Sequence, residues 1–189
     1  MKKIPDVESF LLWTSFYPEA KIRSETDKDM ITFYYVRHGE TLFNQLNRMQ
    51  GACDSPLTIK GIAQAEETAS VLQKVPFDQC YCSSSGRARQ AAEIICRPHG
   101  IRPVPDDALR EFDFGDYDGE NISTFKDLIN AHHVSDDWTD VHGENITLFA
   151  KRTRPFFTKA AEKAEEGNTI LIVSHGSFFM HLLDTAKTL

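Results

Sequence analysis

Two histidines follow two apolar segments of the sequence in the same way. His38 comes after the run at residues 31–36, His175 comes after the run at residues 169–174, and a glycine follows each histidine. Short apolar runs rich in β-branched and aromatic residues predict buried strands. In open α/β sheets the active crevice lies at the carboxyl ends of the strands. We therefore expect one pocket to receive both imidazoles if the two strands are neighbours.

Two arginines accompany these histidines. Arg37 precedes His38 directly, and Arg87 falls in the first turn of a predicted helix that Ser85 can cap. The first turn of a helix favours anions because the helix dipole is positive there. Gly176 leaves the neighbouring backbone N–H groups open to a ligand. Two guanidinium groups and two imidazoles around one position suit a tetrahedral phosphoryl group, since arginine can bind its oxygens in pairs.

Neither a metal nor another cofactor is expected. The sequence contains no P-loop and no evident Asp-Asp magnesium pair, so side-chain cations are expected to replace the metal. His132, His133 and His142 could suggest a metal cluster. Histidines in a polar loop are more often surface residues, and we interpret these three in that way.

Phosphoryl transfer without a metal requires a nucleophile and an acid. A neutral imidazole nitrogen is a competent nucleophile that forms a covalent intermediate. Glu111, which stands ahead of a glycine-containing loop, is the candidate to protonate the leaving oxygen and then to deprotonate water. The alternative is a solvated acid, because the same loop carries Asp113, Asp116, Asp118 and Glu120.

The elements that must position these residues alternate between strand and helix. Thr58 is a predicted N-cap, and Asp54 is interpreted as a turn residue, with support of the helix after Thr58 as the alternative. The alternation predicts an α/β domain with a mostly parallel sheet and helices on both faces. The predicted strands cover residues 31–36, 78–83, 102–105 and 169–174, and the predicted helices cover residues 59–75, 87–98, about 122–131, about 146–166 and about 177–187.

From about residue 33 to about residue 183, these motifs resemble the histidine phosphatase superfamily, also called the phosphoglycerate-mutase-like family. Residues 37–39 match its RHG signature, and QGACDSPLTIKG at residues 50–61 resembles its Gly, Asp, Pro-Leu-Thr, Gly block. HGEN, which contains Glu144, resembles the family's GES-type segment. The resemblance implies a three-layer αβα sandwich of the phosphoglycerate-mutase-like kind.

The resemblance also implies roles for individual residues. It makes His38 the phosphorylated nucleophile, Glu111 the proton donor and His175 the second histidine of the pocket. Asn44 stands at the family's usual place downstream of the RHG signature. The implied catalytic set is His38, Glu111 and His175, and the implied phosphate-binding set is Arg37, Arg87, Asn44 and Gly176.

The composition limits the possible partners. A formal charge of −7 and a pI near 5.5 argue against a nucleic acid or an anionic membrane, which require a basic surface. The four cysteines show no CxxC pair and are expected to be reduced. No segment approaches the roughly 18 apolar residues of a membrane span. We therefore expect a cytoplasmic protein whose partner is a small-molecule phosphomonoester, and the oligomeric state stays open.

The chain is interpreted as one domain with an extension. Residues 1–30 are expected to form an N-terminal extension and linker, and residues 31–189 the histidine phosphatase domain. Only 14 residues follow His175, whereas family members commonly carry a further strand and helix. Either this chain is a trimmed version or another segment covers that sheet edge. We hypothesise that the apolar residues 10–17 pack there.

Three functions are compatible with the sequence. The first is a metal-independent phosphatase that acts through phosphohistidine. The second is a phosphoglycerate-type mutase, which the acidic residues 113, 116, 118 and 120 would disfavour if they line the mouth of the site, because they would repel bisphosphates. The third is a non-catalytic phosphate-binding module with the same fold. The physiological substrate is not evident from the sequence.

Overall fold

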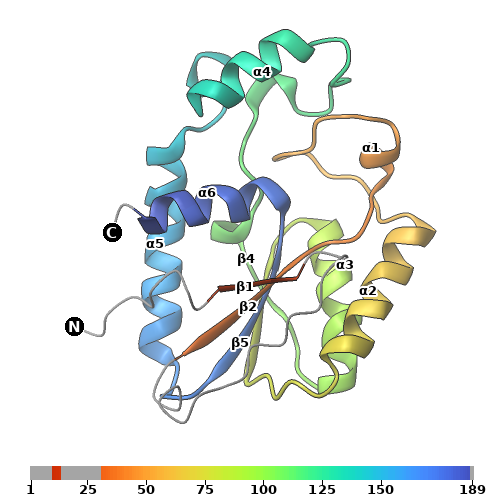
Figure 1. Cartoon of the computed structure of the whole chain (residues 1–189), viewed down its shortest axis with the longest axis vertical. Coiled ribbons are helices and arrows are strands. Elements are labelled where there is room, and N and C mark those ends of the chain that lie inside the picture. The colour runs from red at the N-terminus through yellow and green to blue at the C-terminus, as the bar shows by residue number, and fades with distance from the viewer. Residues whose placement is uncertain (1–9, 14–30, 188–189) are drawn as a thin grey trace.

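A parallel sheet forms the centre of the protein. The structure is a computed structural model that describes residues 10–13 and 31–187. Among these residues, five strands form one sheet in the order β1-β2-β5-β3-β4, and each neighbouring pair is parallel (Figure 1). The strands are β1 (Phe10–Trp13), β2 (Thr32–Arg37), β3 (Gln79–Ser83), β4 (Val104–Asp106) and β5 (Thr169–Ser174).

Helices cover both faces of this sheet, with α2 and α3 on one face and α5 and α6 on the other (Figure 1). The arrangement confirms the predicted three-layer αβα sandwich. The helices are α1 (Leu42–Gln45), α2 (Ile59–Leu72), α3 (Gly86–Cys96), α4 (Lys126–Ser135), α5 (Ile146–Lys163) and α6 (Gly176–Lys187), and 3-10 turns lie at Arg97–His99, Asp107–Leu109, Gly115–Tyr117 and Thr139–Val141.

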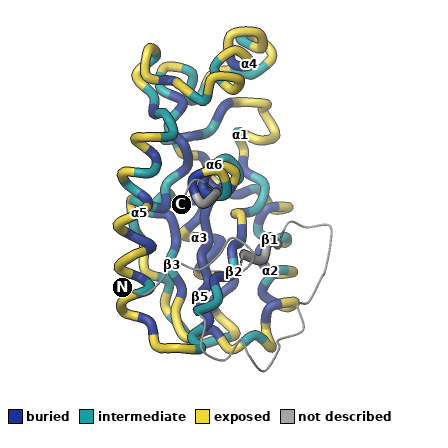
Figure 2. Tube along the Cα trace, turned by 60° about the vertical axis from the view of Figure 1, so that its left-hand side comes forward, coloured by how far each residue is buried: buried dark blue, intermediate teal, exposed yellow. Residues whose placement is uncertain are grey.

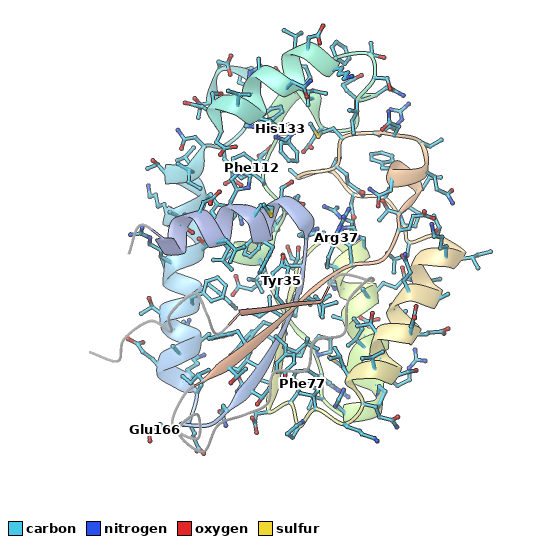
Figure 3. The ribbon with its side chains drawn as sticks, viewed as in Figure 1. Tyr35, Arg37, Phe77, Phe112, His133 and Glu166 are labelled. Carbon is cyan, nitrogen blue, oxygen red and sulfur yellow. The ribbon has the colours of Figure 1, made fainter. Side chains whose placement is uncertain are left out.

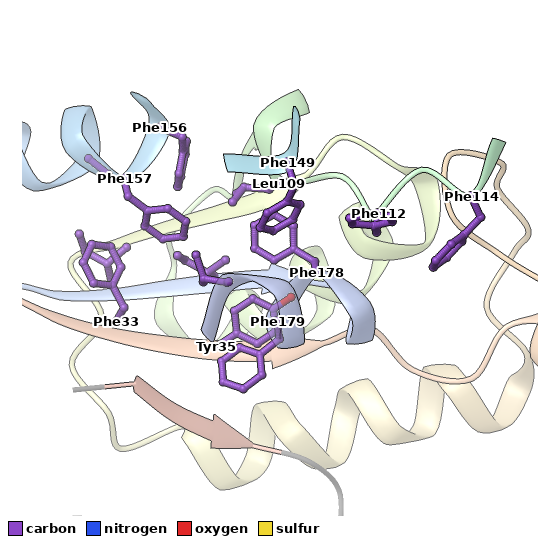
Figure 4. Close-up of a cluster of buried hydrophobic side chains, with 14 of the residues drawn as sticks. Phe33, Tyr35, Leu109, Phe112, Phe114, Phe149, Phe156, Phe157, Phe178 and Phe179 are labelled. Carbon is purple, nitrogen blue, oxygen red and sulfur yellow. The ribbon is translucent and has the colours of Figure 1, made fainter. Parts of the chain in front are cut away.

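The alternation of side chains along the strands divides the core into two layers. In β2, Phe33 and Tyr35 belong to the layer under α5 and α6, whereas Val36 belongs to the layer under α2 and α3. All six residues of β5 are buried because both faces of this central strand are covered (Figure 2). Aromatic rings fill much of the first layer, as Figure 4 shows for Phe33, Tyr35, Phe149, Phe156, Phe157, Phe178 and Phe179.

The predicted helices agree closely with the observed ones except at α4, and the short helix α1 was not predicted. Thr58 caps α2 as predicted, since its hydroxyl oxygen accepts the N–H of Gly61 at 3.0 Å. Helix α4 begins at Lys126 rather than at about residue 122. The reason is a local turn: the side-chain oxygen of Asn121 accepts the N–H of Ser123 at 2.9 Å, and its carbonyl accepts the N–H of Thr124 at 3.1 Å.

Strand β1 comes from the N-terminal extension. It lies at the edge of the sheet and pairs with β2, with Phe10 opposite Phe33 and Trp13 opposite Val36. The segment that we expected at a sheet edge was residues 10–17. Its first four residues do pair with an edge of the sheet, and residues 14–17 lie outside the described residues, as does most of the expected extension.

The carboxyl ends of three neighbouring strands meet at one end of the sheet. Strand β5 lies between β2 and β3, and Arg37 at the end of β2 pairs in register with Ser174 at the end of β5. The segments that contain α1 and α4 lie at this same end of the molecule (Figure 1). The topology therefore brings the two His-Gly junctions together.

Within residues 10–13 and 31–187, no helix has the length and apolar character needed to span a membrane.

The Thr58 cap generates a stability prediction. Thr58→Ala should lower the free energy of unfolding by about 1 kcal/mol, because the N–H of Gly61 loses its acceptor. Urea denaturation followed by circular dichroism measures this change. Thr58→Ser keeps the oxygen and serves as the matched control, so equal losses in the two variants would contradict the capping role.

Candidate active site

His38 presents one unprotonated ring nitrogen to its surroundings. The residue follows β2 directly, is 8% exposed, and donates its backbone N–H to the carbonyl of Ser174 at 3.1 Å. Its Nδ1 lies 2.7 Å from the carbonyl oxygen of Gly39. A carbonyl can only accept, so Nδ1 carries the proton and Nε2 carries the lone pair. The local fold therefore leaves Nε2 as the ring nitrogen that is able to act as a nucleophile.

Burial and positive charge keep this imidazole neutral. Burial, followed by the charge of Arg87, lowers the pKa of His38 to about 3. The hydrogen bond to Gly39 opposes this shift but does not reverse it. At neutral pH, Nε2 is unprotonated and needs no base to activate it.

Arg87 contacts the nucleophilic nitrogen of His38 from within the core. It is 1% exposed, and its Nε donates to Nε2 of His38 at 3.2 Å. Its Nη1 donates to the carbonyl of Cys53 and to Oδ1 of Asp54, both at 2.8 Å, and its Nη2 donates to the carbonyl of Gly51 at 2.9 Å. These contacts use four of the five N–H groups of the guanidinium. Arg87 is therefore fixed in position before any ligand binds.

The N-terminus of α3 is held by Asp54 rather than by Ser85. Oδ2 of Asp54 accepts the N–H of Gly86 at 2.5 Å, and a Cβ at position 86 would lie only 2.7 Å from that oxygen. Ser85 occupies the predicted N-cap position of α3, but its side chain makes no capping hydrogen bond among the described residues. Asp54 thus supports α3 and Arg87, and the alternative that it supports the helix after Thr58 is wrong, because the loop folds it onto the neighbouring helix.

His175 lies beside His38 at the end of β5. The two ring centroids are 5.1 Å apart, and His175 is completely buried. The hydroxyl of Tyr35 fixes its backbone by donating to the carbonyl of His175 at 2.6 Å and accepting its N–H at 2.8 Å. Burial, followed by the charge of Arg87, holds the pKa of His175 well below its ordinary value. Its Nε2 lies 3.3 Å from the hydroxyl of Ser85.

Glu111 lies against the N-terminus of α6. Its carboxylate accepts the N–H groups of Phe112 at 2.9 Å, Ser177 at 3.1 Å and Phe178 at 2.5 Å. The residue is only 8% exposed, and this burial raises the pKa of Glu111 although the three N–H groups oppose the rise. The alternative of a solvated acid is therefore wrong, because this carboxyl is desolvated and more readily protonated than a free glutamate.

A cleft of about 630 Å³ opens in front of His38. Five of the predicted residues line it: Arg37, His38, Asn44, Glu111 and Gly176. Arg37 is exposed, and Figure 3 shows it at the same end of the sheet as His133 of α4. Arg87 and His175 contact His38 or its ring but are not among the lining residues. The structure thus brings all seven predicted residues to one place, with two of them in the layer behind the nucleophile.

Asn44 and Gly176 support this cleft in different ways. Oδ1 of Asn44 accepts the N–H of Thr41 at 3.0 Å and so caps the short helix α1. Its side-chain amide group remains the part that can reach a ligand. A Cβ at Gly176 would come within 3.4 Å of Nε of Arg37, so a larger residue would crowd that guanidinium.

The acidic loop after Glu111 does not line the mouth of the cleft. Asp113 accepts the N–H of Gly115 at 2.9 Å, Asp116 pairs with His142 at 2.9 Å, and Asp118 binds backbone N–H groups. Of the described residues that line the cleft, none belongs to the set 113, 116, 118 and 120. These four acidic side chains therefore do not form part of the cleft wall, where they would have repelled bisphosphates.

The sequence places walls of the pocket in the loops at about residues 42–56 and 113–145, but it does not reveal that α6 contributes to the far wall. This wall is built by the segment before α5 and by the outer face of α6, which are distant in sequence and share no motif. His181 joins them, since its Nδ1 donates to the carbonyl of Ser177 at 2.7 Å and its Nε2 lies 3.5 Å from Oδ1 of Asp136. The residues of this wall are Phe114, Ile122, His133, Asp136, Met180, His181 and Asp184.

The three histidines that could have suggested a metal lie in different environments. His132 contacts the carbonyl of Leu128 and Asp140, whereas His142 pairs with Asp116. The ring of His133 packs edge-on against Trp138. In the part of the chain that the structure describes, no three His, Cys, Asp or Glu side chains are grouped in a way that could hold a metal ion.

Comparison with known proteins agrees with the family resemblance of the sequence motifs. The model of the histidine phosphatase superfamily (branch 1) matches residues 33–189. The chain is 33% identical over 155 residues to a probable phosphoglycerate mutase GpmB of Escherichia fergusonii, which covers 78% of this chain and 70% of that protein. The region predicted from the RHG and His-Gly motifs is therefore the region that the family model matches.

Solved structures share the same fold. Bacillus stearothermophilus YhfR superposes with a TM-score of 0.74 and 33% identity, covering 84% of this chain and 81% of that one. A mycobacterial glucosyl-3-phosphoglycerate phosphatase in complex with VO3 superposes with a TM-score of 0.72 and 27% identity, covering 80% and 79% of the two chains. The similar proteins thus carry the names of both mutases and phosphatases.

The contact between the exposed Asp54 and the buried Arg87 generates a second stability prediction. Asp54→Ala should lower the free energy of unfolding by about 2 kcal/mol, because the buried guanidinium loses its carboxylate partner and the N–H of Gly86 loses its acceptor. The exposed pair of Lys60 with Glu40 offers the control. Lys60→Ala should cost less than about 0.5 kcal/mol. Similar losses in both variants, measured by urea denaturation, would contradict this account.

Proposed function

Because the chain belongs to the histidine phosphatase superfamily, we propose that it is a metal-independent phosphatase that hydrolyses phosphomonoesters of a small molecule through a phosphohistidine intermediate. One observation carries the proposal. Nε2 of His38 has its lone pair free of a proton, and it faces the guanidinium of Arg87 at 3.2 Å. A neutral nucleophile beside a fixed cation is what attack on a phosphate dianion requires.

The first half of the reaction transfers the phosphoryl group to His38. Nε2 forms a bond to phosphorus while the bond from phosphorus to the leaving oxygen breaks. The charge on the phosphoryl oxygens is balanced by Arg37 and Arg87, and the Nε–H of Arg87 turns from Nε2 to one of these oxygens. The carboxyl of Glu111 gives its proton to the leaving oxygen, and its raised pKa supports this role.

The second half regenerates the enzyme. The carboxylate of Glu111 takes a proton from water, and the water oxygen attacks phosphorus. The bond from Nε2 to phosphorus breaks, the electron pair returns to Nε2, and inorganic phosphate leaves. His175 lies behind His38 and is kept neutral by burial, so its ring can donate one hydrogen bond to the transferring group without carrying a charge.

The far wall of the cleft supports a leaving group without a second strong negative charge. Asp136 and Asp184 both line this wall, so a second phosphate there would meet two carboxylates. Phe114, Ile122 and Met180 add apolar surface, which suits the carbon skeleton of a small molecule.

A cytoplasmic location belongs to this proposal as well and rests on the sequence alone.

Two other activities remain as outcomes of the tests. The names of similar proteins support a phosphoglycerate-type mutase, in which the phosphoryl group returns from His38 to another hydroxyl. A mutase would convert 3-phosphoglycerate to its isomer faster than it releases phosphate. A non-catalytic phosphate-binding module would bind vanadate and show no turnover.

The role of His38 generates the first functional prediction. The wild-type protein should release phosphate from p-nitrophenyl phosphate with a chelator present, and vanadate should block the release. His38→Ala should lower kcat by about a thousandfold or more, because the nucleophile is lost. His142→Ala, which changes an exposed histidine outside the cleft, is the control. Full activity of His38→Ala would refute the mechanism.

The pH dependence of this reaction follows from the pKa of His38. A histidine whose pKa is lowered to about 3 stays neutral as the pH falls from about 7 to about 5, so its nucleophilicity is retained there. The phosphohistidine formed in this range, trapped by acid-free quench and measured by mass spectrometry, should therefore not decrease through protonation of His38. A histidine of ordinary pKa would lose most of this signal by about pH 5.

The role of Glu111 is tested by varying the leaving group. Glu111→Gln should lower kcat by about a hundredfold for an alkyl phosphate, whose leaving oxygen needs a proton, and much less for p-nitrophenyl phosphate, whose leaving oxygen does not. The ratio of the two rates within one variant does not depend on the fraction of folded protein. Equal losses for both substrates would show that Glu111 is not the proton donor.

A further inference from the structure

The carboxylate of Asp118 binds three successive backbone N–H groups of the loop at residues 51–53. Oδ1 accepts the N–H of Gly51 at 2.7 Å, and Oδ2 accepts those of Ala52 at 2.6 Å and Cys53 at 3.2 Å. A Cβ at Gly51 would lie 2.4 Å from the carbonyl oxygen of Phe112 and 2.7 Å from Oδ1 of Asp118. Asp118 and the loop are therefore tightly packed, and only glycine fits at position 51.

The opposite side of the same loop faces arginines. The carbonyls of Gly51 and Cys53 accept from Arg87 at 2.9 and 2.8 Å, and the carbonyl of Ala52 accepts from Arg110 at 2.7 Å. The N–H side of these peptide groups thus faces a carboxylate, and the C=O side faces guanidinium groups. Aligned dipoles between opposite charges reinforce both sets of hydrogen bonds.

We propose that Asp118 is a positioning residue for catalysis, which fixes the loop at residues 51–53 so that its carbonyls hold Arg87 against His38. The inference rests on the proposed phosphatase function. None of the four groups that Arg87 contacts belongs to Asp118. Asp118 acts through the loop, because two of those four groups are carbonyls of this loop.

The proposal explains a requirement of the reaction. When phosphorus binds to Nε2 of His38, the Nε–H of Arg87 loses its partner and must turn to a phosphoryl oxygen. A guanidinium held only by Asp54 could rotate about that single contact. The carbonyls of Gly51 and Cys53 bind both of its terminal nitrogens and so keep Nε directed at the site of transfer.

A double-mutant cycle separates this role from a general effect on stability. Asp118→Asn replaces one acceptor oxygen by an NH2 group that faces backbone donors, and Arg87→Lys removes the fork that the loop carbonyls bind. Asp118→Asn should lower kcat/KM for p-nitrophenyl phosphate about tenfold in the wild-type background, mainly through kcat, and less than about twofold in the Arg87→Lys background. An equal loss in both backgrounds would overturn the proposal.

The matched control is Asp116→Asn. Asp116 lies two residues earlier in the same turn, and its carboxylate pairs with His142 at the surface. This variant should keep wild-type kcat/KM within about twofold. A tenfold loss in the control would show that any change in this turn impairs the site, and it would overturn a specific role for Asp118. If Asp118→Asn is unfolded at the assay temperature, Asp118→Glu enters the same cycle with the same criterion.

Binding of vanadate keeps the inference separate from the proposed function. If the wild-type protein shows no turnover, the phosphatase proposal fails, and the same cycle is measured on the dissociation constant of orthovanadate by calorimetry. Asp118→Asn should then weaken binding about fivefold with Arg87 present and less than about twofold with Arg87→Lys. Equal weakening in both backgrounds, or none in either, would overturn the role of Asp118.

Discussion

The hydrogen bond from Arg87 to His38 is the interaction around which the rest of the site is arranged. Its geometry requires a guanidinium that is nearly inaccessible to solvent, at 1% exposure, and yet charged. A buried charge is costly unless opposite charges and hydrogen bonds surround it. The fold meets this requirement with a carboxylate, Asp54, and with two backbone carbonyls from the same loop.

The contacts that stabilise the buried charge of Arg87 join parts of the chain that are far apart in sequence. The loop at residues 51–53 has carbonyls on Arg87 and N–H groups on Asp118. A second network acts on Glu111: Arg152 pairs with Glu144 at 2.6 Å and donates to the backbone carbonyl of Glu111 at 3.1 Å. His38 and Glu111 are thus each placed by a set of charged contacts outside the cleft.

Burial sets the protonation of the two reacting groups in opposite and useful directions. Desolvation disfavours a charged group, so it lowers the pKa of His38 and raises the pKa of Glu111. Burial thus leaves the imidazole of His38 unprotonated, while the carboxyl of Glu111 holds a proton more readily than a free glutamate. A single physical cause supports both roles in the proposed mechanism.

The sequence by itself predicted strands β2 to β5, most helices and the candidate site residues, because these depend on local patterns: apolar runs that end in His-Gly, a Thr58 cap and an RHG signature. Strand β1 and the short helix α1 were not predicted. Tertiary structure decided the contacts between distant segments. Asp54 caps α3 in place of Ser85, Asp118 binds a loop about 65 residues away, and α4 and α6 together form the far wall. A carboxylate in a polar loop looks the same in sequence whether it faces solvent, a helix end or a backbone loop, and only the fold distinguishes these cases.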